Sequence, residues 1–158
     1  MIQIGDKAPD FKLLDTEGSP VELSSFRGKN VVLLFFPFAN TGVCTKELCS
    51  FRDGMEQYNS LNAQVLAASV DSLFSLKPWK EKNNLNFPVL SDFNKTAIKA
   101  YDAMYDVFAP GKFDYQGVAK RSAFVIDKEG IVRYAEVLEI AGNEPNYDAI
   151  NHVLAELN

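Results

Sequence analysis

The stretch NVVLLFF at residues 30–36 decides the fold class of this chain. After Asn30 it is an unbroken run of aliphatic and aromatic side chains, which is typical of a strand buried on both faces of a largely parallel sheet. Pro37 ends the run, and the turn ANTG follows at residues 39–42. From Val43 to Tyr58, apolar residues recur at spacings of three to five and predict an amphipathic helix. The sequence therefore predicts a buried strand, a tight turn and a helix in immediate succession.

The same alternation of strands and helices continues along the rest of the chain. Further strands are predicted at residues 64–70, 88–90, 122–126 and 131–137, the last two joined as a hairpin by the turn DKEG. Further helices are predicted at residues 72–84, 95–101 and 146–157. Pro78 either interrupts the first of these helices or marks its start. This order predicts an α/β core with an antiparallel edge.

Residues 102–117 fit no regular element. They combine aromatic and aliphatic side chains with Pro110 and two glycines, which predicts a long ordered loop. Its apolar side chains either pack beneath the loop or serve substrate access or a subunit contact.

The size and charge of the chain exclude several classes of protein. A length of 158 residues predicts a single domain over residues 1–158. The net charge of −5 provides no basic field for nucleic acid or anionic lipid, so neither nucleic acid nor a membrane is expected as a partner. The longest apolar run, residues 31–39, is too short to span a bilayer, and no secretory signal precedes it. The expected location is cytoplasmic.

The two cysteines, Cys44 and Cys49, are too few for a disulfide scaffold. Together with the single His152 they are also too few for a structural zinc site, so no metal is expected. In a reducing compartment the pair serves either packing or redox chemistry. Cys44 is predicted in the first helical turn at the carboxyl end of a strand, where α/β folds place their ligands. The dipole of that helix start and the charge of Lys46 favour the thiolate form of Cys44.

The spacing Pro37-x3-Thr41-x2-Cys44, after a buried strand and at the start of a helix, resembles the active-site motif of the peroxiredoxins. The segment GDKAPDF at residues 5–11 is similar to the opening of that family, and Arg121 matches its distant active-site arginine. Within the family, FPVLSDF at 87–93 and IVRYAE at 131–136 resemble the alkyl hydroperoxide reductase E group. By contrast, CTKELCSFRD at 44–53 resembles the bacterioferritin comigratory protein group.

This resemblance implies a fold and an activity. The fold is α/β and thioredoxin-like, with a central mixed β-sheet flanked by helices and an N-terminal β-hairpin extension. The activity is that of a thiol-dependent peroxidase that reduces hydrogen peroxide and organic hydroperoxides without a metal, haem or flavin. The expected reductant is a thioredoxin-like or glutaredoxin-like protein, because the oxidised cysteine must return to the thiol at each turnover. The chain is expected to be a homodimer or a monomer.

Two other functions compete with this one. A thioredoxin-type disulfide exchanger requires Cys-x-x-Cys, but Thr41 occupies the first of those places. A non-catalytic redox sensor would use the oxidation of Cys44 only to change partners.

Each residue of the predicted site has a role in peroxide reduction. The Cys44 thiolate attacks one peroxide oxygen, while Arg121 holds the thiolate and meets the charge that develops on the other oxygen. The Thr41 hydroxyl accepts from the peroxide proton and donates to the thiolate. Pro37 has no N–H and shields the thiolate without competing for it. By resemblance Glu47 orients the arginine; from chemistry alone it is equally a first-turn carboxylate favoured by the helix dipole.

Cys49 admits two interpretations. On an intact helix, five residues correspond to about 7.5 Å of rise and about 140° of rotation. A disulfide requires Cβ atoms about 3.8 Å apart, so the helix must first unwind. In the first interpretation Cys49 then attacks the Cys44 sulfenic acid and forms an intramolecular disulfide that prevents overoxidation, as in one subgroup of the family. In the second, Cys49 only packs and an external thiol reduces Cys44. We expect the first.

Overall fold

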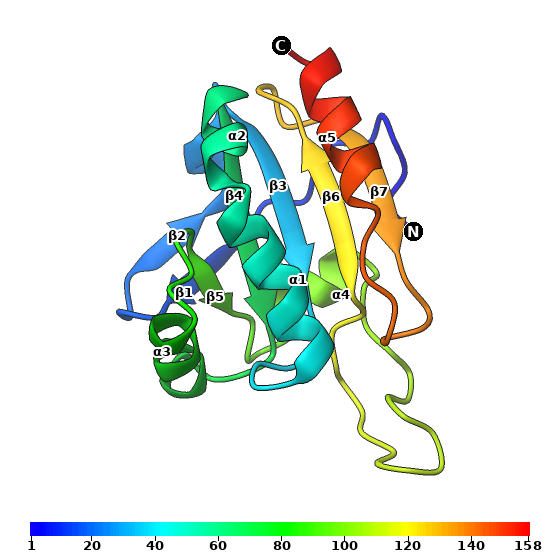
Figure 1. The fold of residues 1–158 in the computed structure, drawn as a ribbon. Coiled ribbons are helices and arrows are strands. Elements are labelled where there is room, and N and C mark those ends of the chain that lie inside the picture. Colours follow the sequence, from blue (N-terminus) through cyan, green and yellow to red (C-terminus); the bar gives the residue numbers. More distant parts are fainter.

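The computed structural model describes all residues, 1–158, and contains seven strands and five α-helices. In chain order the elements are β1 (Lys12–Asp15), β2 (Pro20–Glu22), the 3-10 helix η1 (Leu23–Phe26), β3 (Asn30–Phe35), α1 (Gly42–Asp53), α2 (Met55–Ser60), β4 (Ala63–Ser69), α3 (Leu73–Lys82), β5 (Val89–Ser91), α4 (Thr96–Ala100), β6 (Ser122–Ile126), β7 (Val132–Val137) and α5 (Tyr147–Glu156) (Figure 1). None of these helices combines the length and the apolar character needed to cross a membrane.

The seven strands form one mixed sheet in the order β2-β1-β5-β4-β3-β6-β7. Strand β3 pairs in parallel with β4, and β4 pairs in parallel with β5. At one edge, the hairpin of β1 and β2 joins the sheet through an antiparallel pairing of β1 with β5. At the other edge, β6 lies antiparallel to both β3 and β7. The predicted mixed sheet, N-terminal hairpin and antiparallel edge are therefore all observed.

Strand β3 is buried along its whole length, as its sequence predicted. Val32 and Leu34 belong to the apolar cluster on one face of the sheet, and Val31 and Leu33 to the cluster on the other face. This division follows from the pleat, because successive side chains of a strand point to opposite faces. Helices cover both faces of the sheet at its centre, so both faces of β3 pack against other elements.

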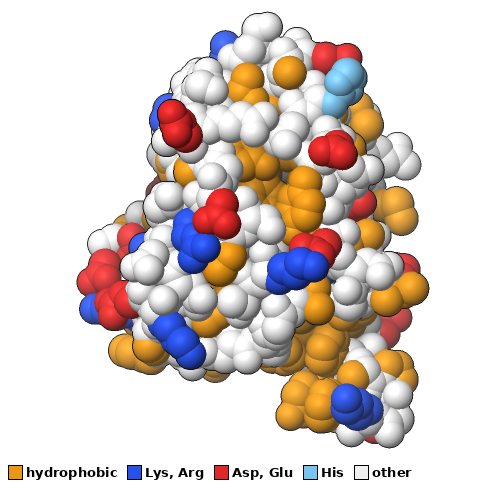
Figure 2. All heavy atoms as spheres, viewed as in Figure 1, with side chains coloured by type: hydrophobic (Ala, Val, Ile, Leu, Met, Phe, Trp, Pro, Cys, Tyr) orange, Lys and Arg blue, Asp and Glu red, His pale blue; other side chains and the backbone are white.

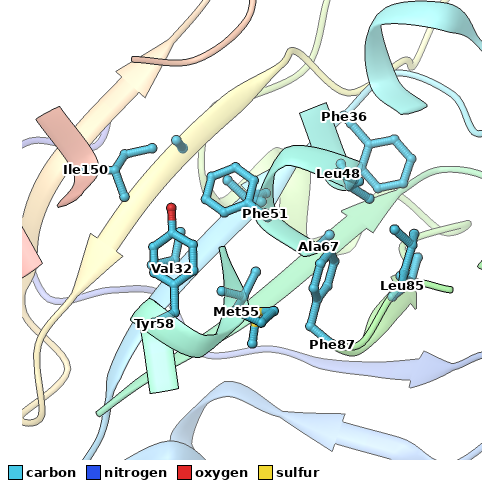
Figure 3. Close-up of a cluster of buried hydrophobic side chains, with 14 of the residues drawn as sticks. Val32, Phe36, Leu48, Phe51, Met55, Tyr58, Ala67, Leu85, Phe87 and Ile150 are labelled. Carbon is cyan, nitrogen blue, oxygen red and sulfur yellow. The ribbon is translucent and has the colours of Figure 1, made fainter. Parts of the chain in front are cut away.

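The first of these clusters fixes helix α1 against the sheet. Figure 3 shows Leu48 and Phe51 of α1 among Val32 of β3, Ala67 of β4 and Ile150 of α5, and all five side chains are buried. Helix α4 contributes to the cluster on the opposite face of the sheet. The position of α1, and with it the position of Cys44, is therefore set by core packing.

One helix was predicted from Val43 to Tyr58, but the structure contains two. Helix α1 ends at Asp53 and α2 begins at Met55, with Gly54 between them at φ −92° and ψ 4°. A Cβ atom on Gly54 would lie 3.3 Å from the ring of Tyr58, so glycine permits a close approach at this turn. The apolar periodicity continues across the break because both helices pack on the same cluster.

Pro78 lies inside α3 and neither interrupts the helix nor starts it. The helix starts after Ser72, whose side chain accepts a hydrogen bond from the N–H of Ser75. Because proline has no N–H, Pro78 cannot donate the helical hydrogen bond to the carbonyl of Phe74, which lies in the first turn. The helix continues to Lys82 without that bond.

The loop of residues 102–117 projects from the body of the molecule at the carboxyl end of the sheet (Figure 1). Tyr105 is buried, whereas Val107, Phe113 and Tyr115 are exposed by 38%, 50% and 52%. Figure 2 shows hydrophobic side chains gathered on this projection. The apolar residues of the loop therefore pack beneath it only in part, and the remainder form an exposed surface.

Candidate active site

Cys44 lies in the first turn of α1, directly beyond the end of β3. Thr41 has extended backbone angles at the N-cap, and its carbonyl accepts the N–H of Thr45 at 3.0 Å. The N–H groups that precede this bond have no partner within the helix, so the helix start favours negative charge. The side chain of Cys44 is only 2% exposed. The predicted placement at a helix start is confirmed.

Arg121 reaches this helix from a distant part of the chain. It immediately precedes β6, and the pairing of Ser122 with Phe35 brings it beside the end of β3. Its Nη2 donates to Cys44 Sγ at 3.2 Å, and its Nη1 donates to Glu47 Oε1 at 2.7 Å. Its Nε and Nη2 also donate to the carbonyl of Ala141 at 3.0 and 2.9 Å. The guanidinium is therefore held rigidly against the sulfur.

The three ionisable groups of this cluster are all buried, at 2%, 0% and 2% exposure for Cys44, Glu47 and Arg121. Burial alone would lower the pKa of Arg121, but the charges of Glu47 and Cys44 together outweigh burial and raise that pKa. Burial raises the pKa of the Glu47 carboxyl to about 7, against the opposing charge and hydrogen bond of Arg121. Glu144 and Glu136 raise it further by repulsion. The cluster thus contains a fixed cation and a carboxyl group that titrates near neutral pH.

This carboxyl group is expected to make the protein less stable as the pH rises from about 5 to 7. The folded protein holds the Glu47 proton more tightly than the unfolded chain, where the pKa returns to 4.5. The stabilisation is complete below the unfolded pKa and is lost as the pH rises through the folded pKa. Urea unfolding at a series of pH values should show this fall in the wild type. Glu47→Gln should lack it, whereas Glu56→Gln, on an exposed position of α2, should keep it. An equal fall in stability with pH in Glu47→Gln would contradict the assignment of this pH dependence to the Glu47 carboxyl group.

A pocket of about 240 Å³ opens over Cys44 and includes Pro37, Thr41 and Arg121 in its wall. The Thr41 hydroxyl donates to the carbonyl of Phe38 at 2.7 Å. Its oxygen is therefore free to accept a hydrogen bond from a ligand, whereas the predicted donation to the thiolate is not observed. Pro37 is buried beside the sulfur, where its missing N–H leaves no competing donor.

Lys46 does not supply the positive charge that the sequence suggested for Cys44. Its Nζ lies 3.1 Å from Glu144 Oε2, and its side chain is largely exposed. Two residues on a helix correspond to a rotation of about 200°, so Lys46 projects from a different face than Cys44. The positive charge beside the sulfur is that of Arg121.

Cys49 lies on a different side of the same intact helix. Both cysteines are free thiols, and Cys49 Sγ is 3.9 Å from Oδ1 of Asn83 beyond the end of α3. Trp79 of α3 also contacts α1, because its Nε1 donates to Thr45 Oγ1 at 3.1 Å. A bond between the two sulfurs therefore requires α1 to unwind locally, as the spacing predicted.

Two further residues contribute to the site although the sequence did not predict them. Ala141 acts through its backbone carbonyl, which any residue would supply, so its side chain carries no signal. Phe108 lines the pocket and packs edge-on against Phe38 with ring centroids 5.5 Å apart. The apolar composition of residues 102–117 was the only available signal for Phe108.

Comparison with known proteins identifies the family of this chain. The model of the AhpC/TSA family matches residues 4–135. The chain therefore belongs to the AhpC/TSA family. Among curated relatives of this AhpC/TSA protein, a putative peroxiredoxin bcp of Coxiella burnetii is 40% identical over 131 residues, which cover 83% of this chain and 85% of the relative. Alkyl hydroperoxide reductase E of Mycobacterium tuberculosis is 39% identical over 138 residues, which cover 87% and 86%. The predicted resemblance to both groups is confirmed.

Solved structures agree with this assignment. Peroxidoxin BcpB from Mycobacterium tuberculosis matches with a TM-score of 0.87 and 28% identity, covering 100% of this chain and 99% of that chain. A peroxiredoxin-like protein from Aquifex aeolicus matches with a TM-score of 0.88 and 27% identity, covering 99% and 88%. The predicted thioredoxin-like α/β fold is confirmed by these matches.

Proposed function

We propose that this chain is a thiol-dependent peroxidase that reduces hydroperoxides through Cys44. The single observation that supports it most strongly is the 3.2 Å contact between Arg121 Nη2 and Cys44 Sγ in the wall of a pocket. An arginine is always charged, so it stabilises a thiolate and any anionic oxygen that forms beside it. The names of the relatives, peroxiredoxin and alkyl hydroperoxide reductase E, point to the same chemistry.

In the proposed reaction the Cys44 thiolate attacks the terminal oxygen of the hydroperoxide. A sulfur–oxygen bond forms, the oxygen–oxygen bond breaks, and the departing oxygen takes a proton to become water or an alcohol. Glu47 and Ala141 already hold Arg121 in position, so it stabilises the negative charge that develops on the departing oxygen without having to reorganise. Thr41 Oγ1 accepts the hydrogen bond of the peroxide and orients it. The product on Cys44 is a sulfenic acid.

Stopped-flow fluorescence tests this proposal directly. Trp79 is the only tryptophan, and its Nε1 donates a hydrogen bond to the side chain of Thr45, the residue after Cys44. We expect its emission to change on mixing with hydrogen peroxide, with a rate constant far above that of free cysteine, and to remain constant in Cys44→Ser. A rate constant no greater than that of free cysteine contradicts a peroxidase and favours the redox sensor.

We further propose that Cys49 resolves the Cys44 sulfenic acid. After one equivalent of peroxide, mass spectrometry of the wild type should show the loss of two hydrogen atoms, as expected for an intramolecular disulfide. Cys49→Ser should instead gain one oxygen atom. Ser50→Ala, next to Cys49 on α1, should behave as the wild type. A gain of oxygen in both the wild type and Cys49→Ser removes Cys49 from the cycle and leaves the external-thiol alternative.

The partners of this reaction are also proposals. A disulfide between Cys44 and Cys49 requires a dithiol reductant, so we propose a thioredoxin-like or glutaredoxin-like protein. The exposed apolar residues Val107, Phe113 and Tyr115 near the pocket support a homodimer contact over a monomer, which sedimentation measurements would distinguish. The single domain over residues 1–158 and the cytoplasmic location stay predictions.

A further inference from the structure

Two buried acidic groups share a single cation beside the reactive sulfur. Arg121 donates through Nη2 to Cys44 Sγ at 3.2 Å and through Nη1 to Glu47 Oε1 at 2.7 Å, and all three side chains are buried. The remaining hydrogen bonds of the guanidinium go to the carbonyl of Ala141, which carries no charge. One positive charge therefore faces a thiol and a carboxyl group, each of which becomes an anion when it loses its proton.

The other ionisable groups around Glu47 do not supply a second positive charge. Glu136 of β7 and Glu144 of the segment before α5 both act on it by repulsion. Burial and the neighbouring carboxylates raise the pKa of the Tyr147 phenol on α5, so this group is neutral. Lys46 of α1 pairs with Glu144 at 3.1 Å and is largely exposed. The shared guanidinium is therefore the main group that favours an ionised carboxylate.

The second oxygen of the Glu47 carboxyl group has no hydrogen-bond partner. Oε2 is buried without a donor, whereas Oε1 accepts from Arg121. An ionised carboxylate carries charge on both oxygens, so a buried Oε2 without a donor makes the ionised form costly. In the protonated form Oε1 still accepts the bond of the guanidinium, and Oε2 carries no charge. The geometry therefore favours a protonated Glu47 whenever the guanidinium has another anion beside it.

We propose that Glu47 holds a proton while Cys44 is a thiolate and releases it when Cys44 becomes a sulfenic acid, because Arg121 pairs with one anion at a time. A thiolate and a carboxylate together would leave a surplus negative charge in a buried cluster, which is unfavourable. A sulfenic acid is neutral, so after oxidation the carboxylate becomes the counterion of the guanidinium. The inference rests on the proposed peroxidase function, in which the thiolate is oxidised.

The proton count of the peroxide step then balances within the site. Cys44 Sγ bonds to the terminal oxygen of the hydroperoxide, which keeps its hydrogen, and the oxygen–oxygen bond breaks. The electron pair of that bond goes to the departing oxygen, which gains one proton as the Glu47 carboxyl group loses one. The sulfur is oxidised and the hydroperoxide is reduced, with no net proton taken from the solvent. Arg121 stays charged throughout. Glu47 acts through Arg121 and is a positioning residue.

Cys44→Ser tests the coupling without any peroxide. Serine carries no charge, so Arg121 then pairs with Glu47 alone. The readout is the infrared carbonyl stretch of the protonated Glu47 carboxyl group, identified by its loss in Glu47→Gln and followed over a series of pH values. We expect its titration midpoint to fall by at least about one pH unit in Cys44→Ser, a tenfold change in proton affinity. Glu56→Gln, on an exposed position of α2, is the matched control and should keep the midpoint of the wild type.

Oxidation of Cys49→Ser tests the release of the proton, since this variant retains the sulfenic acid. With one equivalent of hydrogen peroxide below the titration midpoint, the protonated carboxyl band should disappear, and a pH indicator in weak buffer should record almost no net proton uptake. Cys49→Ser/Glu47→Gln should instead take up about one proton for each sulfur oxidised. The loss of thiolate absorbance reports independently that the peroxide step has occurred. If Glu47→Gln does not fold, isotope-labelled glutamate separates the band from that of the buried Asp92, and Cys44→Ser decides.

Three results overturn the proposal. The first is an equal titration midpoint in Cys44→Ser and the wild type, and the second is a protonated carboxyl band that persists after the sulfenic acid has formed. The third is uptake of a full proton by Cys49→Ser itself, because Glu47 was then ionised from the start. A lower midpoint in Cys44→Ser together with a peroxide reaction no faster than that of free cysteine is a different outcome. It supports the coupling between the two acidic groups and contradicts the peroxidase function.

Discussion

Arg121→Met is expected to lower the rate constant of the peroxide step by about 10²–10³-fold, the cost of removing one preorganised donor. The same change should destabilise the fold by about 3–5 kcal/mol, because it leaves a buried group without its partner. The unpaired group is Glu47, whose Oε1 loses the 2.7 Å contact and whose Oε2 already has no partner. Stopped-flow kinetics and urea unfolding measure the two effects separately.

A second substitution separates the catalytic effect of Arg121 from its structural effect. In Arg121→Met/Glu47→Gln an amide replaces the buried carboxyl group that has lost its partner, so part of the stability should return while the rate stays low. The stability loss of Arg121→Met alone should also shrink at pH 5, because the Glu47 carboxyl is then protonated and neutral. Recovery of the rate in the double variant would mean that Arg121 acts only by supporting the fold.

The parts of the site that are local in sequence were the most predictable. Pro37, Thr41 and Cys44 lie within one strand-to-helix connection, so the burial of β3 and the start of α1 place them together. Arg121 is 77 positions from Cys44, and only its resemblance to a family motif identified it. Its actual position follows from the antiparallel register of β3 and β6, which no local pattern specifies.

Side-chain directions were the least predictable part. Lys46 was expected to act on Cys44, but core packing through Leu48 and Phe51 rotates α1 so that Lys46 meets Glu144. Likewise, the Thr41 hydroxyl donates to the Phe38 carbonyl, a bond that depends on the exact path of the turn. Sequence patterns identify which face of a helix is apolar, whereas these contacts depend on its final rotation in the packed core.

Phe51→Ala is expected to destabilise the protein by about 3–5 kcal/mol, as usual for a large aromatic side chain lost from a core. Phe51 is fully buried and joins three helices. Its ring stacks on that of Tyr58 of α2 with centroids 5.4 Å apart, and both residues are labelled in Figure 3. It also packs edge-on against Tyr147 of α5 with centroids 5.5 Å apart. Urea unfolding measures the loss. Phe74→Ala is the matched control, since Phe74 is 81% exposed on α3.

This pair of variants also tests what holds α1 in place. A shift within about 0.5 kcal/mol is expected for Phe74→Ala, as for most exposed positions. Because Cys44 and Phe51 occupy the same helix, Phe51→Ala should also make local unwinding of α1 easier. Disulfide formation with Cys49, followed by mass spectrometry after one equivalent of peroxide, should therefore be faster in Phe51→Ala than in Phe74→Ala. Equal stability of the two variants would mean that contacts other than the aromatic cluster fix the helix that carries the reactive sulfur.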